Sequence, residues 1–169
     1  GLTHAEQPFV CTLAEQGLGL KIGNDGVYFQ PLDGTDPVDE PPKTGGLLTA
    51  LAQFKQMVTA GPQSFSVCEY LGSEPLDGHG PRCDVLLTQT AQVQTKWLIR
   101  QSDQRLIGFD TALTRDVDAC EIRFGDTTII EGKPFPSPFT VRSGGAEFST
   151  FRVTAIELSP ALSAGKKTP

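Results

Sequence analysis

Apolar and polar residues alternate through most of this chain, and a period of two residues predicts β-strands. The clearest example is the segment of residues 91–100. One side of that segment carries Ala91, Val93, Thr95, Trp97 and Ile99, and the other carries Gln92, Gln94, Lys96 and Arg100. One apolar side and one polar side are typical of a strand in an antiparallel sheet with one face in water.

Shorter segments of the same character predict further strands, and glycine-rich pairs predict the turns between them. The expected strands are residues 9–13, 18–22, 27–29, 65–70, 83–87, 106–109, 120–124, 127–130, 139–142 and 148–158. Turns are expected at Gly23-Asn24-Asp25-Gly26, Gly125-Asp126 and Gly144-Gly145. Asn, Asp and Gly tolerate the positive φ of tight hairpin turns, so most of these strands should pair with their neighbours in the chain.

One segment, residues 47–60, has the spacing of a helix instead. Its apolar residues recur three and four positions apart: Leu47, Leu48, Leu51, Phe54, Met57 and Val58. This stripe predicts an amphipathic helix that packs on a sheet. Thr44 lies in the expected N-cap region, and Gly61-Pro62 should end the helix.

A single helix among many strands argues against parallel units in which helices and strands alternate. We therefore predict a mainly β fold, at the border of α+β: an antiparallel β-sandwich or partly closed barrel with the helix near residues 47–60 packed on it. The chain has 169 residues, which suits one domain. We expect that domain to span residues 1–158, followed by a flexible C-terminal tail over residues 159–169.

Charge and hydropathy exclude two classes of partner. The chain carries 14 Lys and Arg against 20 Asp and Glu, for a formal net charge of −6. Phosphate backbones require concentrated basic residues, so nucleic acid is not expected as a partner. No apolar stretch approaches the roughly 20 residues of a membrane-spanning helix, so no membrane span is expected. The oligomeric state cannot be read from the sequence.

The four cysteines suggest disulfides. Cys11, Cys68, Cys83 and Cys120 form an even set without a CxxC pair, and the chain has only two histidines. This spacing disfavours a zinc site or a redox dithiol. We predict the pairs Cys68–Cys83 and Cys11–Cys120, and with them an extracytoplasmic location, periplasmic or secreted. The alternative is four small apolar core residues in a reduced protein.

Two groups of acidic residues carry the only candidate chemistry. Asp33, Asp36 and Asp39 lie in a proline-rich loop and could bind calcium, although their spacing is not that of an EF-hand, and a solvated loop is the alternative. No other cofactor is expected. A second group, Asp110, Asp116 and Asp118, could supply carboxylates for hydrolysis or could simply form turns.

The polar segment between Cys68 and Cys83 is the expected binding loop. We place Tyr70, His79 and Arg82 there as contact residues, because loops on a rigid scaffold commonly carry recognition. No catalytic residue is assigned, because no nucleophile motif accompanies His79. The expected function is that of a secreted or periplasmic non-catalytic module that binds a protein or glycan, such as an inhibitor, adhesin or envelope assembly factor. The alternative is a carboxylate- or metal-dependent hydrolase acting on a polysaccharide or cell-wall substrate.

Overall fold

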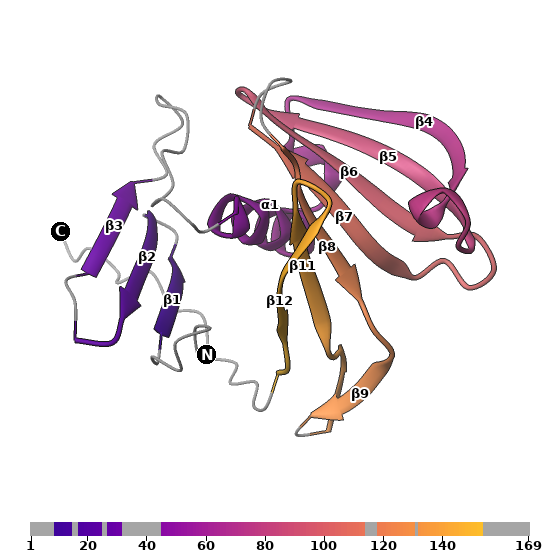
Figure 1. Cartoon of the computed structure of the whole chain (residues 1–169). Coiled ribbons are helices and arrows are strands. Elements are labelled where there is room, and N and C mark those ends of the chain that lie inside the picture. Colours follow the sequence, from indigo (N-terminus) through magenta and orange to yellow (C-terminus); the bar gives the residue numbers. More distant parts are fainter. Residues whose placement is uncertain are drawn as a thin grey trace, which may run out of the picture.

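The computed structural model describes residues 9–14, 17–24, 27–31, 45–113, 118–130 and 132–153. The strands are β1 (Phe9–Ala14), β2 (Gly17–Ile22), β3 (Val27–Pro31), β4 (Val67–Pro75), β5 (Arg82–Thr90), β6 (Val93–Arg100), β7 (Leu106–Ala112), β8 (Cys120–Phe124), β9 (Thr127–Ile130), β10 (Lys133–Pro136), β11 (Phe139–Ser143) and β12 (Ala146–Phe151). The α-helix is α1 (Leu47–Ala60), and short 3₁₀ turns cover Pro62–Ser64 and Leu76–Gly78. The prediction of a mainly β fold with one packed helix is confirmed (Figure 1).

A seven-stranded antiparallel sheet dominates the described part of the chain. Its strand order is β12-β11-β8-β7-β6-β5-β4, so consecutive strands from β4 to β8 are also neighbours in space. Strands β1 to β3 form a separate three-stranded sheet, and β9 and β10 form a two-stranded hairpin. The large sheet ends at β12 and β4, which do not pair with each other, so the sheet does not close into a barrel.

One face of the large sheet, called here the inner face, packs against α1. Trp97, Phe109, Ile122 and Val141 stand side by side on adjacent strands, and each is almost fully buried. The ring of Phe109 stacks on Trp97 at 5.0 Å and on Phe54 of α1 at 5.6 Å between ring centroids. The apolar stripe of the helix therefore packs against the apolar side of the strands, as the sequence pattern predicts.

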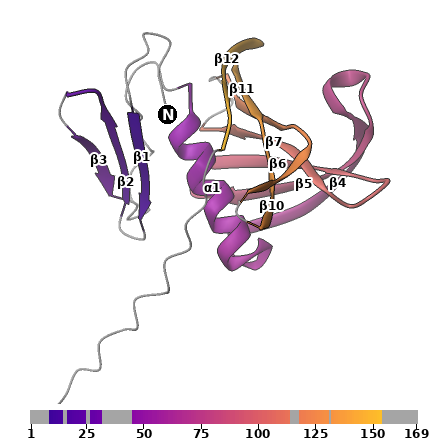
Figure 2. The same cartoon turned by 90° about the horizontal axis from the view of Figure 1, so that it is seen from below.

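The expected sandwich is not seen, because the helix occupies the place where a second sheet would pack. Figures 1 and 2 show α1 between the large sheet and the β1–β3 sheet, and α1 contacts both β7 and β1. The layers are sheet, helix and small sheet.

The opposite face, called here the outer face, is not uniformly polar as the alternation predicts. Cys83, Val85, Leu98 and Ile107 form a second buried apolar cluster there, and Leu76 packs against it. An irregularity in the β6–β7 pairing between Leu98 and Ile99 accompanies this departure from simple alternation along β6. A bulge of this kind changes the direction in which neighbouring side chains point.

The start of α1 also differs from the prediction. Thr44 lies outside the described residues, and Gly46 is the N-cap, with no side-chain hydrogen bond to the helix. Gly46 has φ of 79°, and a Cβ there would lie 2.9 Å from Cβ of Cys120. Only glycine satisfies both the left-handed conformation and this close approach of the helix to β8. The predicted end at Gly61-Pro62 is confirmed.

The predicted Cys68–Cys83 disulfide is wrong. Cys68 and Cys83 are both free thiols. Cys68 stands opposite Thr88 in the β4–β5 register, five residues along β5 from Cys83. Five residues of a strand span about 17 Å, whereas a disulfide needs Cα atoms within about 7 Å. No disulfide is present among the described residues. The side chain of Cys11 lies outside them, so the pairing with Cys120 stays a prediction.

Candidate functional site: the β4–β5 hairpin

The best-organised polar group on the described surface lies on the outer face, where Arg123 of β8 extends across its neighbour β7. It crosses the sheet over Gly108, which lacks a side chain. A Cβ at that position would lie 2.6 Å from the carbonyl oxygen of Ile122 and 3.1 Å from Cδ of Arg123. The missing side chain lets the arginine lie flat on the strands, so that its side chain is only 14% exposed.

Arg123 binds the 3₁₀ turn that joins β4 to β5. Its Nη2 lies 2.8 Å from Oδ1 of Asp77, and its Nη1 lies 2.5 Å from Oδ1 of Asp110 on β7. Asp77 has φ of 49°, a left-handed conformation that Asp adopts more readily than most residues. The turn therefore presents this carboxylate toward the sheet. The next residue, Gly78, continues the turn with φ of 82°.

Glu121 and Arg142 complete this group, which we call the Arg123 network. Arg142 lies 3.4 Å from Asp77 and 3.5 Å from Glu121. Burial alone would lower the pKa of Arg123, but its hydrogen bonds to Asp77 and Asp110 outweigh this and raise that pKa above its ordinary value. The hydrogen bond from Arg123 likewise lowers the pKa of Asp77. Both ions stay charged, which keeps the turn fixed to the outer face.

The turn covers the apolar cluster of the outer face as well. Leu76 contacts the cluster that contains Cys83 and Val85, and the turn closes on itself through a hydrogen bond from Leu76 N to Pro81 O at 2.9 Å. Burial raises the pKa of the Cys83 thiol, so this sulfur stays protonated and inert at neutral pH. One apolar contact and one ionic network thus hold the end of the β4–β5 hairpin.

All three predicted contact residues lie exposed on this hairpin. Tyr70 lies in β4 and donates its hydroxyl hydrogen bond to Oδ1 of Asp84 at 3.0 Å, a contact that raises the pKa of Tyr70. Arg82, at the start of β5, donates to Oγ of Ser73 at 3.1 Å. His79 follows the 3₁₀ turn directly. The structure places them along one hairpin rather than in one pocket.

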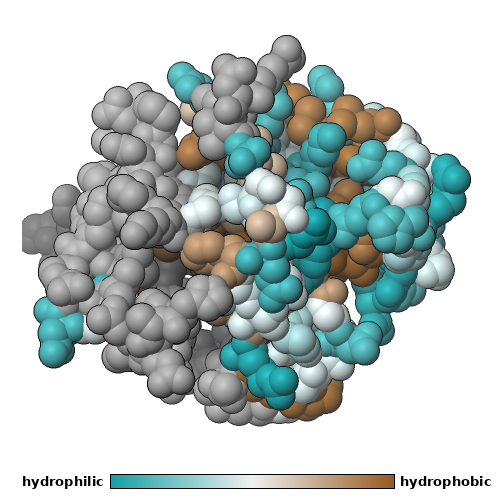
Figure 3. All heavy atoms as spheres, viewed as in Figure 1, coloured by the Kyte–Doolittle hydropathy of each residue, from teal (hydrophilic) through white to brown (hydrophobic). Residues whose placement is uncertain are grey.

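Strand β4 is the more exposed of the two strands of the hairpin. Tyr70 is 65% exposed and its neighbour Leu71 is 51% exposed. The β4–β5 register skips Leu71, so this residue forms a bulge. Figure 3 shows apolar side chains reaching the surface at the upper right, in the region where Figure 1 draws β4 and β5. Sequence alternation predicted a strand here but not that it would end the sheet.

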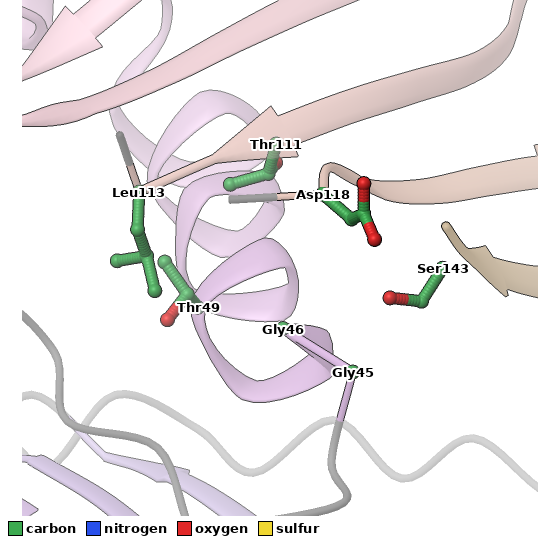
Figure 4. Close-up of a pocket in the computed structure, with 7 residues that line it drawn as sticks. All are labelled: Gly45, Gly46, Thr49, Thr111, Leu113, Asp118 and Ser143. Atoms are coloured by element: carbon green, nitrogen blue, oxygen red, sulfur yellow. The ribbon is translucent and has the colours of Figure 1, made fainter. Parts of the chain in front are cut away.

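A separate recess of about 260 Å³ opens where α1 begins, on the inner-face side (Figure 4). It is lined by Gly45, Gly46, Thr49, Thr111, Leu113, Asp118 and Ser143. Figure 4 shows the side chains of Asp118 and Ser143 pointing toward this space. The hydroxyl groups and the one carboxylate would suit a small polar molecule. Four separate segments supply the lining, so no local sequence pattern signals the recess.

The predicted acidic groups do not form one site in the described residues. Asp110 is bonded to Arg123 on the outer face, whereas Asp118 lines the recess at the start of α1. Asp116 and the candidate calcium ligands Asp33, Asp36 and Asp39 lie outside the described residues. Within residues that are described, no three His, Cys, Asp or Glu side chains are placed to hold a metal ion. No helix in the described part is long and apolar enough to cross a membrane.

Comparison with known proteins adds no relative. The chain matches no protein-family model, no curated protein and no solved structure. The candidate site is therefore identified from its geometry alone and not from a relative.

Proposed function

We propose that this chain is a non-catalytic module that binds another macromolecule, and that the β4–β5 hairpin makes the contact. The observation that carries the proposal is the adjacent pair Tyr70 and Leu71, two large apolar side chains exposed on a strand. Tyrosine is enriched in protein interfaces because its ring gives area and its hydroxyl gives a hydrogen bond at low entropic cost. Exposed apolar groups gathered at one place commonly mark such contacts.

The rigidity of the hairpin supports the same proposal. Asp77 is fixed by Arg123, Tyr70 by Asp84, and Arg82 by Ser73. A surface that is already ordered loses little conformational entropy on binding. The described thiols form no disulfide, so the proposal does not depend on an oxidising compartment.

The test is capture from an extract of the source cells, with matched variants. Tyr70→Ser/Leu71→Ser removes the exposed apolar pair. Val58→Ser/Ile129→Ser is the control, because each of those residues is 66% exposed elsewhere on the molecule. We expect a specific partner that binds the control like the unmodified chain and the hairpin variant about tenfold more weakly. Equal binding by both variants, or no specific partner, would overturn the proposal.

A further inference from the structure

We infer that the β4 edge binds an extended peptide segment as an added strand, and that this segment carries basic residues at positions i and i+4. The inference rests on the proposed function and names the kind of partner. Strand addition to an exposed sheet edge is a general mode of peptide recognition, in which backbone hydrogen bonds supply affinity and side chains supply specificity.

The sheet topology leaves the edge available. Strand β4 stands at the end of the seven-stranded order and pairs with β5 alone. Among the described residues, its other side therefore offers backbone N–H and C=O groups without a strand partner. The strand is nine residues long, which is enough for an added strand of ordinary length.

The charge of the edge selects the partner. Glu69 and Glu74 are exposed and form no ion pair with a described residue. In the register with β5, Glu69 stands opposite Leu87 and Glu74 stands opposite Cys83. Leu87 and Cys83 are four residues apart on β5, so both glutamates lie on the outer face. Strand β4 contains no Lys or Arg.

The bulge sets the spacing. Glu69 and Glu74 are five residues apart in β4, but the register shortens this to four because Leu71 is skipped. A regular strand beside β4 presents residues i and i+4 on one face, about 13 Å apart. Between the two glutamates, a Cβ at Gly72 would meet nothing within 4 Å, which leaves room for the intervening side chain of the partner.

A second copy of this chain fits the edge less well than a basic segment. Antiparallel pairing of β4 with β4 would bring two acidic strands together, and no register would supply a base. Like charges opposite one another destabilise a strand pair, whereas opposite charges stabilise it.

The experiment measures fluorescence anisotropy of labelled nine-residue peptides with the full chain. One peptide has Lys at positions i and i+4 in a frame of Thr and Ser, and a second has the same composition with Lys at i and i+3. A third has Glu at i and i+4. We expect the first peptide to bind at least about fivefold more tightly than the second, because only i and i+4 lie on one face. The preference should fall in high salt.

Matched variants assign the preference to β4. The variant Glu69→Lys/Glu74→Lys should no longer bind the Lys peptide and should bind the Glu peptide more tightly instead. Asp126→Lys/Glu147→Lys makes the same change in net charge at exposed positions outside β4, and it should behave as the unmodified chain. Amide hydrogen exchange should slow in β4 when the Lys peptide is bound.

Three outcomes would overturn the inference: no dependence on Lys spacing, the same loss in both charge variants, or a dimer that forms through β4. If capture from extract depends on Tyr70 and Leu71 while the peptides do not bind, the strand-addition inference fails and the proposed function stands. If capture is also indifferent to Tyr70 and Leu71, the proposed function fails as well.

Discussion

The two faces of the large sheet are stabilised in different ways. On the inner face, Phe109 and Ile122 are covered by α1, and their burial requires no particular partner atom. On the outer face, a smaller apolar cluster is covered by a short turn that Arg123 binds through Asp77. Apolar burial is non-directional, whereas an ionic network depends on each member. The inner face should therefore determine stability, and the outer face should determine the shape of the hairpin.

The largest loss of stability should follow from a substitution at the centre of the inner face. Phe109→Ala removes a ring that is 0% exposed and stacks on both Trp97 and Phe54. We expect a loss of about 4 kcal/mol in the free energy of unfolding, measured by urea denaturation. Ile129→Ala, at an exposed position, is the control and should change it little. Similar losses in the two variants would mean that this ring is not the centre of the core.

Arg123→Met should lower the free energy of unfolding somewhat less, by about 3 kcal/mol. The change leaves Asp77, Asp110 and Glu121 without the cation that they share. Amide exchange should become faster in the turn of residues 76–80 than in β6. Arg105→Met is the control, because Arg105 is 62% exposed and, among the described residues, its one ion pair is with Asp103 at 3.6 Å. If the turn keeps its protection without Arg123, the network does not hold the hairpin.

Gly108→Ala tests whether the path of Arg123 across the sheet requires a missing side chain. The added methyl group would lie 2.6 Å from a backbone oxygen and 3.1 Å from the arginine chain. We expect a loss of about 2 kcal/mol in thermal or urea unfolding. The double variant Gly108→Ala/Arg123→Met should lose less than the sum of the two single changes. Strict additivity would show that the two residues are independent.

A smaller effect should appear in the pH dependence of stability. The pKa of Asp77 is lowered in the folded chain, so the unfolded state takes up the proton first as pH falls. Its contribution is complete above the unfolded pKa of about 3.9 and is lost as pH falls through the lower folded value. Compared with Asp77→Asn, the unmodified chain should be more stable by about 1 kcal/mol at pH 7, and this advantage should shrink at acid pH, below the unfolded pKa. An advantage that persists there would contradict the assignment.

The smallest perturbation is chemical labelling, which should leave stability unchanged. Cys68 is exposed, whereas Cys83 is fully buried with a raised pKa. Iodoacetamide added to the native protein should alkylate Cys68 and spare Cys83, as read by mass spectrometry of peptides. Both thiols should react after denaturation without reductant. A Cys68 that resists alkylation until reductant is added would restore the disulfide prediction.

Local patterns were sufficient for the helix and for most of the strands. The stripe from Leu47 to Val58 predicts α1 with the bounds that the structure has, and alternation around Trp97 predicts β6. These features depend on residues within one or two turns of each other, so a single sequence reveals them. Local patterns were not sufficient for the β4–β5 hairpin, because a strand that ends at residue 70 and then a loop were expected, whereas β4 continues to Pro75.

Contacts between distant residues were not readable in the same way. Asp77 and Arg123 are 46 positions apart in the chain, and nothing near either residue points to the other. The Cys68–Cys83 prediction was wrong for the same reason: a short separation in the chain favours pairing, but the hairpin register puts the two thiols far apart. The sandwich was expected because period two cannot distinguish a face covered by a sheet from one covered by a helix.

The sequence by itself therefore determined the position of the helix and of most strands, whereas β10 and the second half of β4 were not predicted. Only the tertiary structure decided that β4 ends the large sheet, that α1 fills its inner face, and that Arg123 fixes the turn on its outer face. The physical reason is the distance along the chain over which each kind of interaction acts. Periodicity and turn chemistry act between near neighbours, whereas register, bulges and ionic partners depend on how distant strands pack together.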